Sequence, residues 1–404
     1  MRILYFLYAM SLVFLLTSGV HHPDGLNDPP RENRQIVPGA WQTDAYMHML
    51  EGKRIAVAGN HTSMVADRHL VDTLLASGVK VVKVFSPEHG FRGEAADGEL
   101  VESYVDSETG IPVISLYGRN RRPTKEQLEN VDLILFDIQD VGARFYTYIS
   151  TMTYIMEEAS RLDIPVVVLD RPNPNRHYVD GPVLDPEYAS FIGLHPVPIV
   201  YGMTIGEYAR MVCGENWLIY DEQCDLTVIT VAGYDHTSRY VLPLPPSPNL
   251  PNMRAVYLYP SLCLFEGTDI SIGRGTGHPF QVFGHPSLPE DQFPFQFTPQ
   301  SVSASPNPPQ LGNKCFGRDL RDLPIEELRQ KHQINLEYIL EAYAHFPEKE
   351  LFFNRGFEIR AGNNLLREQI KAGYTAEEIR KSWQEDLDAF KKIRAKYLLY
   401  PDYE

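Results

Sequence analysis

The sequence predicts an α/β protein, with a Rossmann-like, doubly wound parallel sheet followed by a second, smaller α+β domain. Short apolar runs alternate with segments of helical periodicity between residues 54 and 169, which is the pattern of βαβ units. The runs are rich in Val, Ile and Leu, as strands buried on both faces are. The chain has 404 residues, 43% of them hydrophobic, so it is long enough for a large core and more than one domain.

The first residues, 1–19, have the composition of a secretory signal. Arg2 precedes an apolar run over residues 3–16, and the small residues Ser18 and Gly19 follow. An uncleaved membrane anchor is the competing interpretation, but the run is shorter than the roughly 20 residues needed to span a bilayer. We therefore expect cleavage near Gly19 and export to the periplasm or the cell exterior, without stable membrane insertion afterwards.

After a polar lead over residues 20–40, the Rossmann-like domain is expected over residues 41–181. Its parallel strands are expected at residues 54–58, 79–85, 111–116, 132–136 and 164–169. The helices that connect them are expected at residues 69–77, 124–130 and 147–162. Thr124 with Gln127 fits a capping box at the start of the second helix. The crossovers place helices on both faces of the sheet.

Near Pro182 the alternating strand and helix pattern gives way to a mixed α+β pattern, so the second domain is expected over residues 182–404. A helix is expected near residues 205–212 and a strand near 226–231. Residues 242–252 contain five prolines, which predicts an extended, rigid connection. The C-terminal part is helical: Thr375 and Glu378 fit a capping box, and apolar residues follow at helical spacing.

Composition excludes several classes of protein. The formal charge of −16 disfavours nucleic-acid binding, because an acidic protein repels phosphates. The four cysteines do not form a disulfide scaffold or a zinc motif, and either a Cys213–Cys224 bridge or free thiols fit them. Serine-hydrolase, phosphate-loop and zinc-protease motifs are absent from the sequence. The glycine-rich residues 273–277 lie outside the first βαβ unit, so no nucleotide cofactor is predicted. No residue spacing in the sequence is diagnostic for a metal.

Polar side chains follow each predicted strand, where the carboxyl ends of parallel strands meet and ligands bind. They are Asn60, His61, Glu88, His89, Arg92, Tyr117, Arg119, Asp137, Gln139, Asp140, Arg144, Tyr146, Asp170, Arg171 and Asn173. Capping or turn roles compete for the Asp and Asn residues, and a core position competes for His61. Glu88 opens a long polar stretch at residues 88–110, which favours a functional role for it.

Long motifs carry a resemblance to a known family. They are SPEHGFRG (86–93), FDIQDVGARFYTYIST (136–151), LDRPNP (169–174), YGMTIGE (201–207), PPSPNLP (245–251), and LFEGTDIS with GRGT (264–276). Together they resemble the exo-β-N-acetylmuramidases of glycoside hydrolase family 171. The resemblance implies release of N-acetylmuramic acid from the non-reducing end of peptidoglycan fragments during wall recycling. It also implies a Rossmann-like domain, a smaller C-terminal domain and a cleft between them.

The resemblance makes Glu88 central to catalysis, with His89 beside it. Glycosidic cleavage needs a carboxylic acid to protonate the leaving oxygen, and Glu88 would be that acid. The second role falls to an enzyme carboxylate or to the substrate's own 2-acetamido group, with Asp137 or Asp140 orienting that group. Two positions depart from the family pattern, Ile272 and Gln281, where many members have Glu.

Muramic acid carries a lactyl carboxylate, which an acidic enzyme must bind through a local positive pocket. The candidate cations are Arg92, Arg144, Arg171 and Arg274, with Glu266 beside the last. Asn60, His61, Tyr146 and Asn173 complete the predicted binding set. Two rival hypotheses remain. One is a non-catalytic protein that binds muramyl sugars, supported by Ile272 and Gln281, and the other is a hydrolase with a metal at Asp137, Asp170 and His61.

Overall fold

The computed structural model describes residues 35–92, 102–220 and 224–403. The predicted signal at residues 1–19, most of the polar lead and residues 93–101 of the polar stretch lie outside the described residues.

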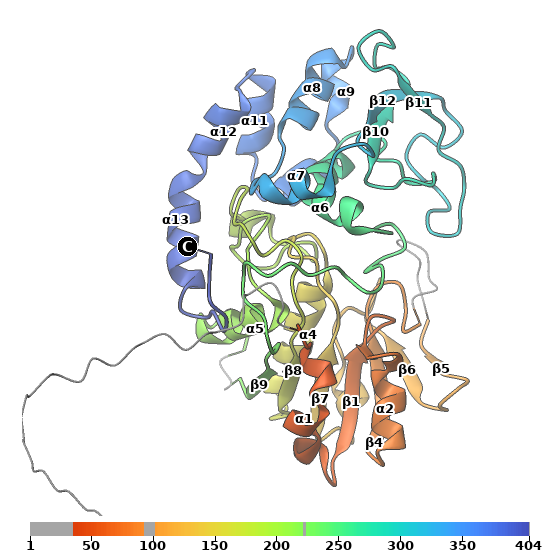
Figure 1. The fold of residues 1–404 in the computed structure, drawn as a ribbon, viewed down its shortest axis with the longest axis vertical. Coiled ribbons are helices and arrows are strands. Elements are labelled where there is room, and N and C mark those ends of the chain that lie inside the picture. The colour runs from red at the N-terminus through yellow and green to blue at the C-terminus, as the bar shows by residue number, and fades with distance from the viewer. Residues whose placement is uncertain (1–34, 93–101, 221–223, 404) are drawn as a thin grey trace, which may run out of the picture. The chain divides into compact units, whose positions relative to one another are not determined.

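A mostly parallel seven-stranded sheet forms the first domain (Figure 1). Its order is β5 (Tyr104–Val105), β6 (Pro112–Ser115), β4 (Lys80–Ser86), β1 (Arg54–Gly59), β7 (Leu133–Asp137), β8 (Val166–Leu169) and β9 (Leu226–Ile229). Only β5 at the edge is antiparallel to its neighbour in this sheet. The six parallel strands have the order 3-2-1-4-5-6 of a doubly wound Rossmann fold, which confirms the predicted fold class.

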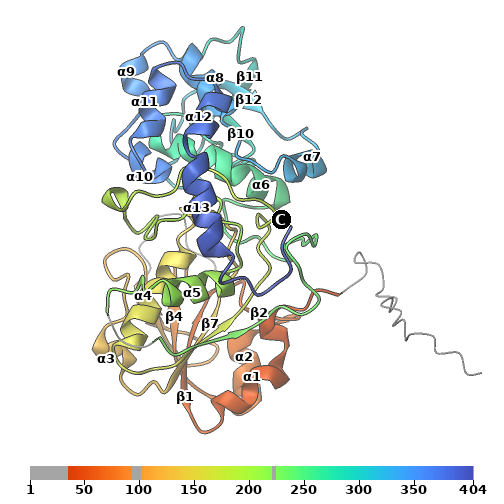
Figure 2. The ribbon, with the colours of Figure 1, turned by 90° about the vertical axis from the view of Figure 1, so that its left-hand side faces the viewer.

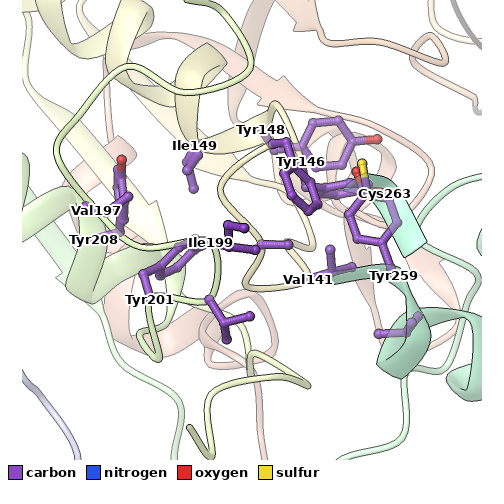
Figure 3. Packing of buried hydrophobic residues seen from close by; sticks show 14 of the residues in the cluster. Val141, Tyr146, Tyr148, Ile149, Val197, Ile199, Tyr201, Tyr208, Tyr259 and Cys263 are labelled. Atoms are coloured by element: carbon purple, nitrogen blue, oxygen red, sulfur yellow. The ribbon is translucent and has the colours of Figure 1, made fainter. Parts of the chain in front are cut away.

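Helices cover both faces of the sheet, and alternate residues of a strand such as β1 pack against the helices on opposite faces. In β1, Ile55 and Val57 pack with α1 (Thr43–Leu50) and α2 (Leu70–Ala76). Ala56 and Ala58 belong to the larger core with α3 (Lys125–Leu128), α4 (Tyr148–Ser160) and α5 (Ile205–Gly214). Figure 2 shows α1 and α2 on one side of the strands and α3 on the other. Figure 3 shows part of the larger core.

The five predicted strands coincide with β1, β4, β6, β7 and β8, and the predicted capping box of Thr124 and Gln127 is present. The structure differs at the predicted domain boundary, because α5 and β9 add a last unit to the sheet and β9 pairs in parallel with β8. Residues 170–204 separate β8 from α5 with little regular structure. The sequence pattern changes near Pro182 because this connection is irregular, and the predicted domain boundary was placed there for that reason.

The second domain begins with α6 (Met253–Leu262) and the 3-10 helix η4 (Cys263–Gly267). A small antiparallel sheet follows, with the order β10 (Val282–His285), β12 (Cys315–Asp319) and β11 (Phe295–Phe297). The remaining helices are α7 (Ile325–Gln330), α8 (Glu337–His345), α9 (Lys349–Phe352), α10 (Phe357–Ala361), α11 (Leu365–Lys371), α12 (Ala376–Ser382) and α13 (Gln384–Arg394). The predicted capping box of Thr375 and Glu378 starts α12, and the helical stripe is interrupted at Trp383.

The C-terminal segment returns to the first domain, and both ribbon views place α13 beside α5 (Figures 1 and 2). Arg394 donates hydrogen bonds to the carbonyl of Gly202 and to Asp402. The hydroxyl of Tyr400 donates to Asp170 at 2.5 Å. The last residues therefore connect the end of the chain to the carboxyl end of the sheet.

Cys213 and Cys224 form a disulfide, whereas Cys263 and Cys315 are buried free thiols. Within the described ranges, none of the helices combines the length and the apolar character needed to cross a membrane.

Candidate active site

A cleft of about 1040 Å³ lies at the carboxyl ends of the parallel strands. Glu88, Tyr117 and Phe191 line it from the first domain, and Glu266, Arg274 and Arg360 line it from the second. A smaller recess of about 50 Å³ lies beside it. The cleft and the recess share Glu88, Phe145, Thr147, Tyr259 and Arg274. Glu88 therefore lies where the two cavities meet, and His89 lines the recess.

The backbone after β4 explains the position of Glu88. The strand ends at Ser86, and the amide of Gly90 donates to the carbonyl of Pro87 at 3.2 Å to close a turn. His89, inside this turn, has a φ of 70°, a left-handed conformation that is uncommon for residues other than glycine. Such strain persists only where the surrounding fold enforces it, and it concentrates at functional sites.

The second-domain wall of the cleft carries a cluster of three charged groups. Arg274 donates to one oxygen of Glu266 at 2.6 Å, and Arg360 donates to the other at 3.1 Å. Burial alone would raise the pKa of Glu266, but the two guanidinium groups outweigh it and hold that pKa below its ordinary value. Two cations and one carboxylate leave the cluster with a net positive charge. This wall can attract an anionic ligand although the whole chain is acidic.

The structure does not bring Asp137 and Asp140, predicted as catalytic, to the lining of either cavity. Asp137 is buried and accepts two hydrogen bonds from Arg171, so each group neutralises the other. Asp140 accepts hydrogen bonds from the hydroxyl of Tyr201 and the amide of Gly142, and burial raises its pKa to about 6. Both aspartates therefore hold the fold together beneath the site, and Arg171 is committed to its ion pair.

Three further predicted binding residues have structural partners and line neither cavity. Arg144 is fully buried and donates to four backbone carbonyls, two of which belong to Arg360 and Ala361. Arg92 pairs with Asp106 at 3.1 Å. Asn173 donates to the carbonyl of Met203. Arg144 still supports the cleft indirectly, because it holds the backbone at Arg360.

Tyr146 lines the recess, whereas Asn60 and His61, also predicted to bind substrate, line neither cavity. Asn60 donates to the hydroxyl of Tyr148 at 3.0 Å. A ring nitrogen of His61 lies 2.8 Å from the carbonyl of Pro245, and the hydroxyl of Tyr146 donates to the carbonyl of Pro246 at 2.7 Å. The proline-rich connection predicted from the sequence thus supplies backbone carbonyls that accept hydrogen bonds from side chains at the aromatic side of the recess.

Sequence reasoning missed several lining residues. Arg360 contacts Glu266 although 94 positions separate them in the chain, and no local motif marks it. Arg121 lies with its guanidinium carbon 4.4 Å from the centre of the Phe191 ring. The arginine-rich residues 119–122, directly after a predicted strand, were a usable signal for Arg121.

The proposed metal ligands do not assemble in the described part of the chain. Asp137 is paired with Arg171 and His61 contacts Pro245, while Asp170 accepts from Thr204 and Tyr400. Across residues 35–92, 102–220 and 224–403, no group of three or more His, Cys, Asp or Glu side chains is arranged to hold a metal ion.

Two family models cover most of the chain. Residues 55–254 match the N-terminal model of the exo-β-N-acetylmuramidase NamZ, and residues 257–400 match the C-terminal model. The chain belongs to the NamZ exo-β-N-acetylmuramidase family. The resemblance drawn from the motifs is thereby confirmed. The NamZ models divide the chain near residue 255, after β9, in agreement with the sheet topology.

The NamZ relatives include a curated Bacillus subtilis protein, peptidoglycan β-N-acetylmuramidase NamZ, which is 37% identical over 98% of both chains. Two crystal structures of DUF1343 family proteins from Bacteroides fragilis have the same fold. One is 48% identical, with a TM-score of 0.84 over 91% of this chain and 99% of that one. The other is 29% identical, with a TM-score of 0.76 over 92% of this chain and all of that one.

The two departures from the NamZ motif pattern lie in different surroundings. Ile272 is buried and lines the cleft. Gln281 is buried and accepts a hydrogen bond from the side chain of Asn252 at 3.2 Å.

Proposed function

We propose that this chain is an exo-β-N-acetylmuramidase, a glycoside hydrolase that releases N-acetylmuramic acid from the non-reducing end of peptidoglycan fragments. Membership of the NamZ family supports the activity, and so does the similarity to the B. subtilis peptidoglycan β-N-acetylmuramidase. The structural observation that carries the proposal is the position of Glu88, at the junction of a small recess and a large cleft.

Glu88 acts as the general acid in this proposal. A carboxylic acid must protonate the leaving oxygen as the glycosidic bond breaks, and such catalysis contributes about 10²- to 10⁴-fold. Among the residues that the structure describes, Glu88 is the one carboxylate that lines both cavities. Glu266, another carboxylate of the cleft wall, is held ionised by two arginines and cannot serve as a proton donor.

The positive cluster of Arg274, Glu266 and Arg360 provides the site for the lactyl carboxylate. Guanidinium groups bind carboxylates through paired, charge-assisted hydrogen bonds. Of the four arginines predicted for this role, Arg274 lines the cleft. Arg360 replaces the other three in the proposal.

The deciding experiment is product analysis of the purified chain incubated with MurNAc-β-1,4-GlcNAc. We expect the wild type to release free MurNAc and GlcNAc. We expect Glu88→Gln to lose about 10²-fold or more in kcat/KM with an unchanged circular dichroism spectrum. Near wild-type turnover by Glu88→Gln would remove Glu88 from the acid role.

A second candidate function is non-catalytic binding of muramyl sugars, favoured by the apolar Ile272 in the cleft where many family members have Glu. Saturable binding of the disaccharide by the wild type, measured by calorimetry without any product, would establish this function instead.

We also propose that the chain is exported, with cleavage of the signal near Gly19. The apolar run at residues 3–16 supports export, and so does the Cys213–Cys224 disulfide, since disulfides persist in oxidising compartments. Cell fractionation with intact-mass measurement tests this proposal: a full-length chain in the cytoplasm would contradict it.

A further inference from the structure

The recess beside Glu88 is enclosed by aromatic rings that pack against one another. The ring of Tyr146 lies 4.7 Å from that of Tyr148 and 5.8 Å from that of Tyr259, and the Tyr259 ring lies 4.9 Å from that of Phe280. Figure 3 shows Tyr146, Tyr148 and Tyr259 grouped together. Because each ring is fixed by its neighbours in edge-to-face contacts, the recess is a preformed cavity.

Glu88, His89 and Arg274 line part of the recess, and the other polar groups of its lining are neutral. Burial raises the pKa of the Tyr146 and Tyr148 hydroxyls, so both stay protonated. Ser247 and Asn249 add a hydroxyl and an amide to the lining. Apolar ring faces with a few neutral hydrogen-bonding groups suit a small polar substituent that also carries a methyl group.

The size of the recess limits its occupant. A volume of about 50 Å³ holds about four water-sized groups, at roughly 10 to 15 Å³ each. A pyranose ring with its hydroxyl groups contains many more groups than four and belongs in the cleft. The nitrogen, carbonyl and methyl groups of an acetamido substituent match the recess in both size and chemistry.

We infer that the recess binds the 2-acetamido group of the sugar whose glycosidic bond is cleaved, and that Leu250 and Phe280 limit the length of the acyl chain. This inference rests on the proposed function. A sugar anchored by its acetamido group has its ring at the mouth of the recess, where Glu88 lies. The recess thus takes the positioning role that the sequence had suggested for Asp137 or Asp140.

The test uses β-muramyl glycosides with one chromogenic leaving group and either an N-acetyl or an N-propionyl substituent. One extra methylene against apolar pocket walls changes kcat/KM by about 10- to 200-fold, so we expect the wild type to prefer N-acetyl by such a factor. Leu250→Ala enlarges the recess and should shift this preference toward N-propionyl by at least about tenfold. Phe280→Leu provides a second, independent enlargement if Leu250→Ala fails to fold.

The matched control is Leu258→Ala, because Leu258 is equally buried but lines neither cavity. It should leave the preference unchanged. Equal preference ratios in the wild type, Leu250→Ala and Leu258→Ala would overturn the inference. A wild type that leaves the N-acetyl glycoside intact would overturn the proposed function instead, and the affinities of these variants for free MurNAc and N-propionylmuramic acid would then decide the role of the recess.

Discussion

At the scale of single residues, a long side chain at a strand end can point into the cleft or into the protein interior. Its direction depends on charged or polar partners that lie far from it in the sequence. Arg171 reaches Asp137 because the carboxyl ends of β7 and β8 are adjacent, as the predicted parallel sheet requires. The sequence predicted that such residues gather, but it did not show that their charges cancel. Arg360 could not be predicted, because its place in the cleft depends on how the second domain packs.

Arg360→Gln tests the lactyl site. It removes one of the two cations near Glu266 and should raise KM for muramyl glycosides by about 10- to 100-fold, the range expected for a lost charge-assisted hydrogen bond. The same glycosides without the lactyl group should be nearly unaffected. Steady-state kinetics on both substrates measure the difference, and Arg318→Gln, which breaks a pair with Glu341 outside the cleft, is the control. Equal losses on both sugars would eliminate the lactyl site.

At the scale of elements, local patterns predicted what local physics determines. The buried strands β1, β4, β6, β7 and β8 and the capping boxes that start α3 and α12 were recognised because each depends on neighbouring residues. The sequence did not predict that β9 belongs to the sheet, because this depends on its pairing with β8 across an irregular connection. The return of the C-terminal segment to the sheet is another long-range contact of this kind.

Asp402→Ala tests how strongly this return holds α13. Arg394 is almost fully buried, and the substitution leaves its guanidinium group without its carboxylate partner. Breaking a buried ion pair costs about 3 kcal/mol or more, so we expect a loss of that order in the free energy of unfolding by urea. Lys396→Ala removes an exposed pair with Glu215 and should cost less than about 1 kcal/mol. A loss below about 1 kcal/mol in Asp402→Ala would show that this ion pair contributes little to holding α13.

At the scale of the whole molecule, the partly buried Glu266 and the fully buried Asp170 give the stability opposite dependences on pH. The folded state holds the pKa of Glu266 below 4.5, so the stabilisation from its ion pairs is present above that pH and is lost as the pH falls. Burial raises the pKa of Asp170 from 3.8 to about 7, against the effect of hydrogen bonds from Tyr400 and Thr204. The folded state therefore binds the proton of Asp170 more tightly than the unfolded state does.

The sign for Asp170 gives a specific prediction. Its contribution to stability is complete below about pH 4 and declines as the pH rises toward 7, because ionising the buried carboxyl costs free energy. Asp170→Asn cannot ionise, so its stability relative to the wild type should improve steadily over this interval. Urea unfolding at several pH values between 4 and 7.5 measures this difference. Parallel curves for the two proteins would mean that Asp170 stays ionised throughout, and that its hydrogen bonds outweigh its burial.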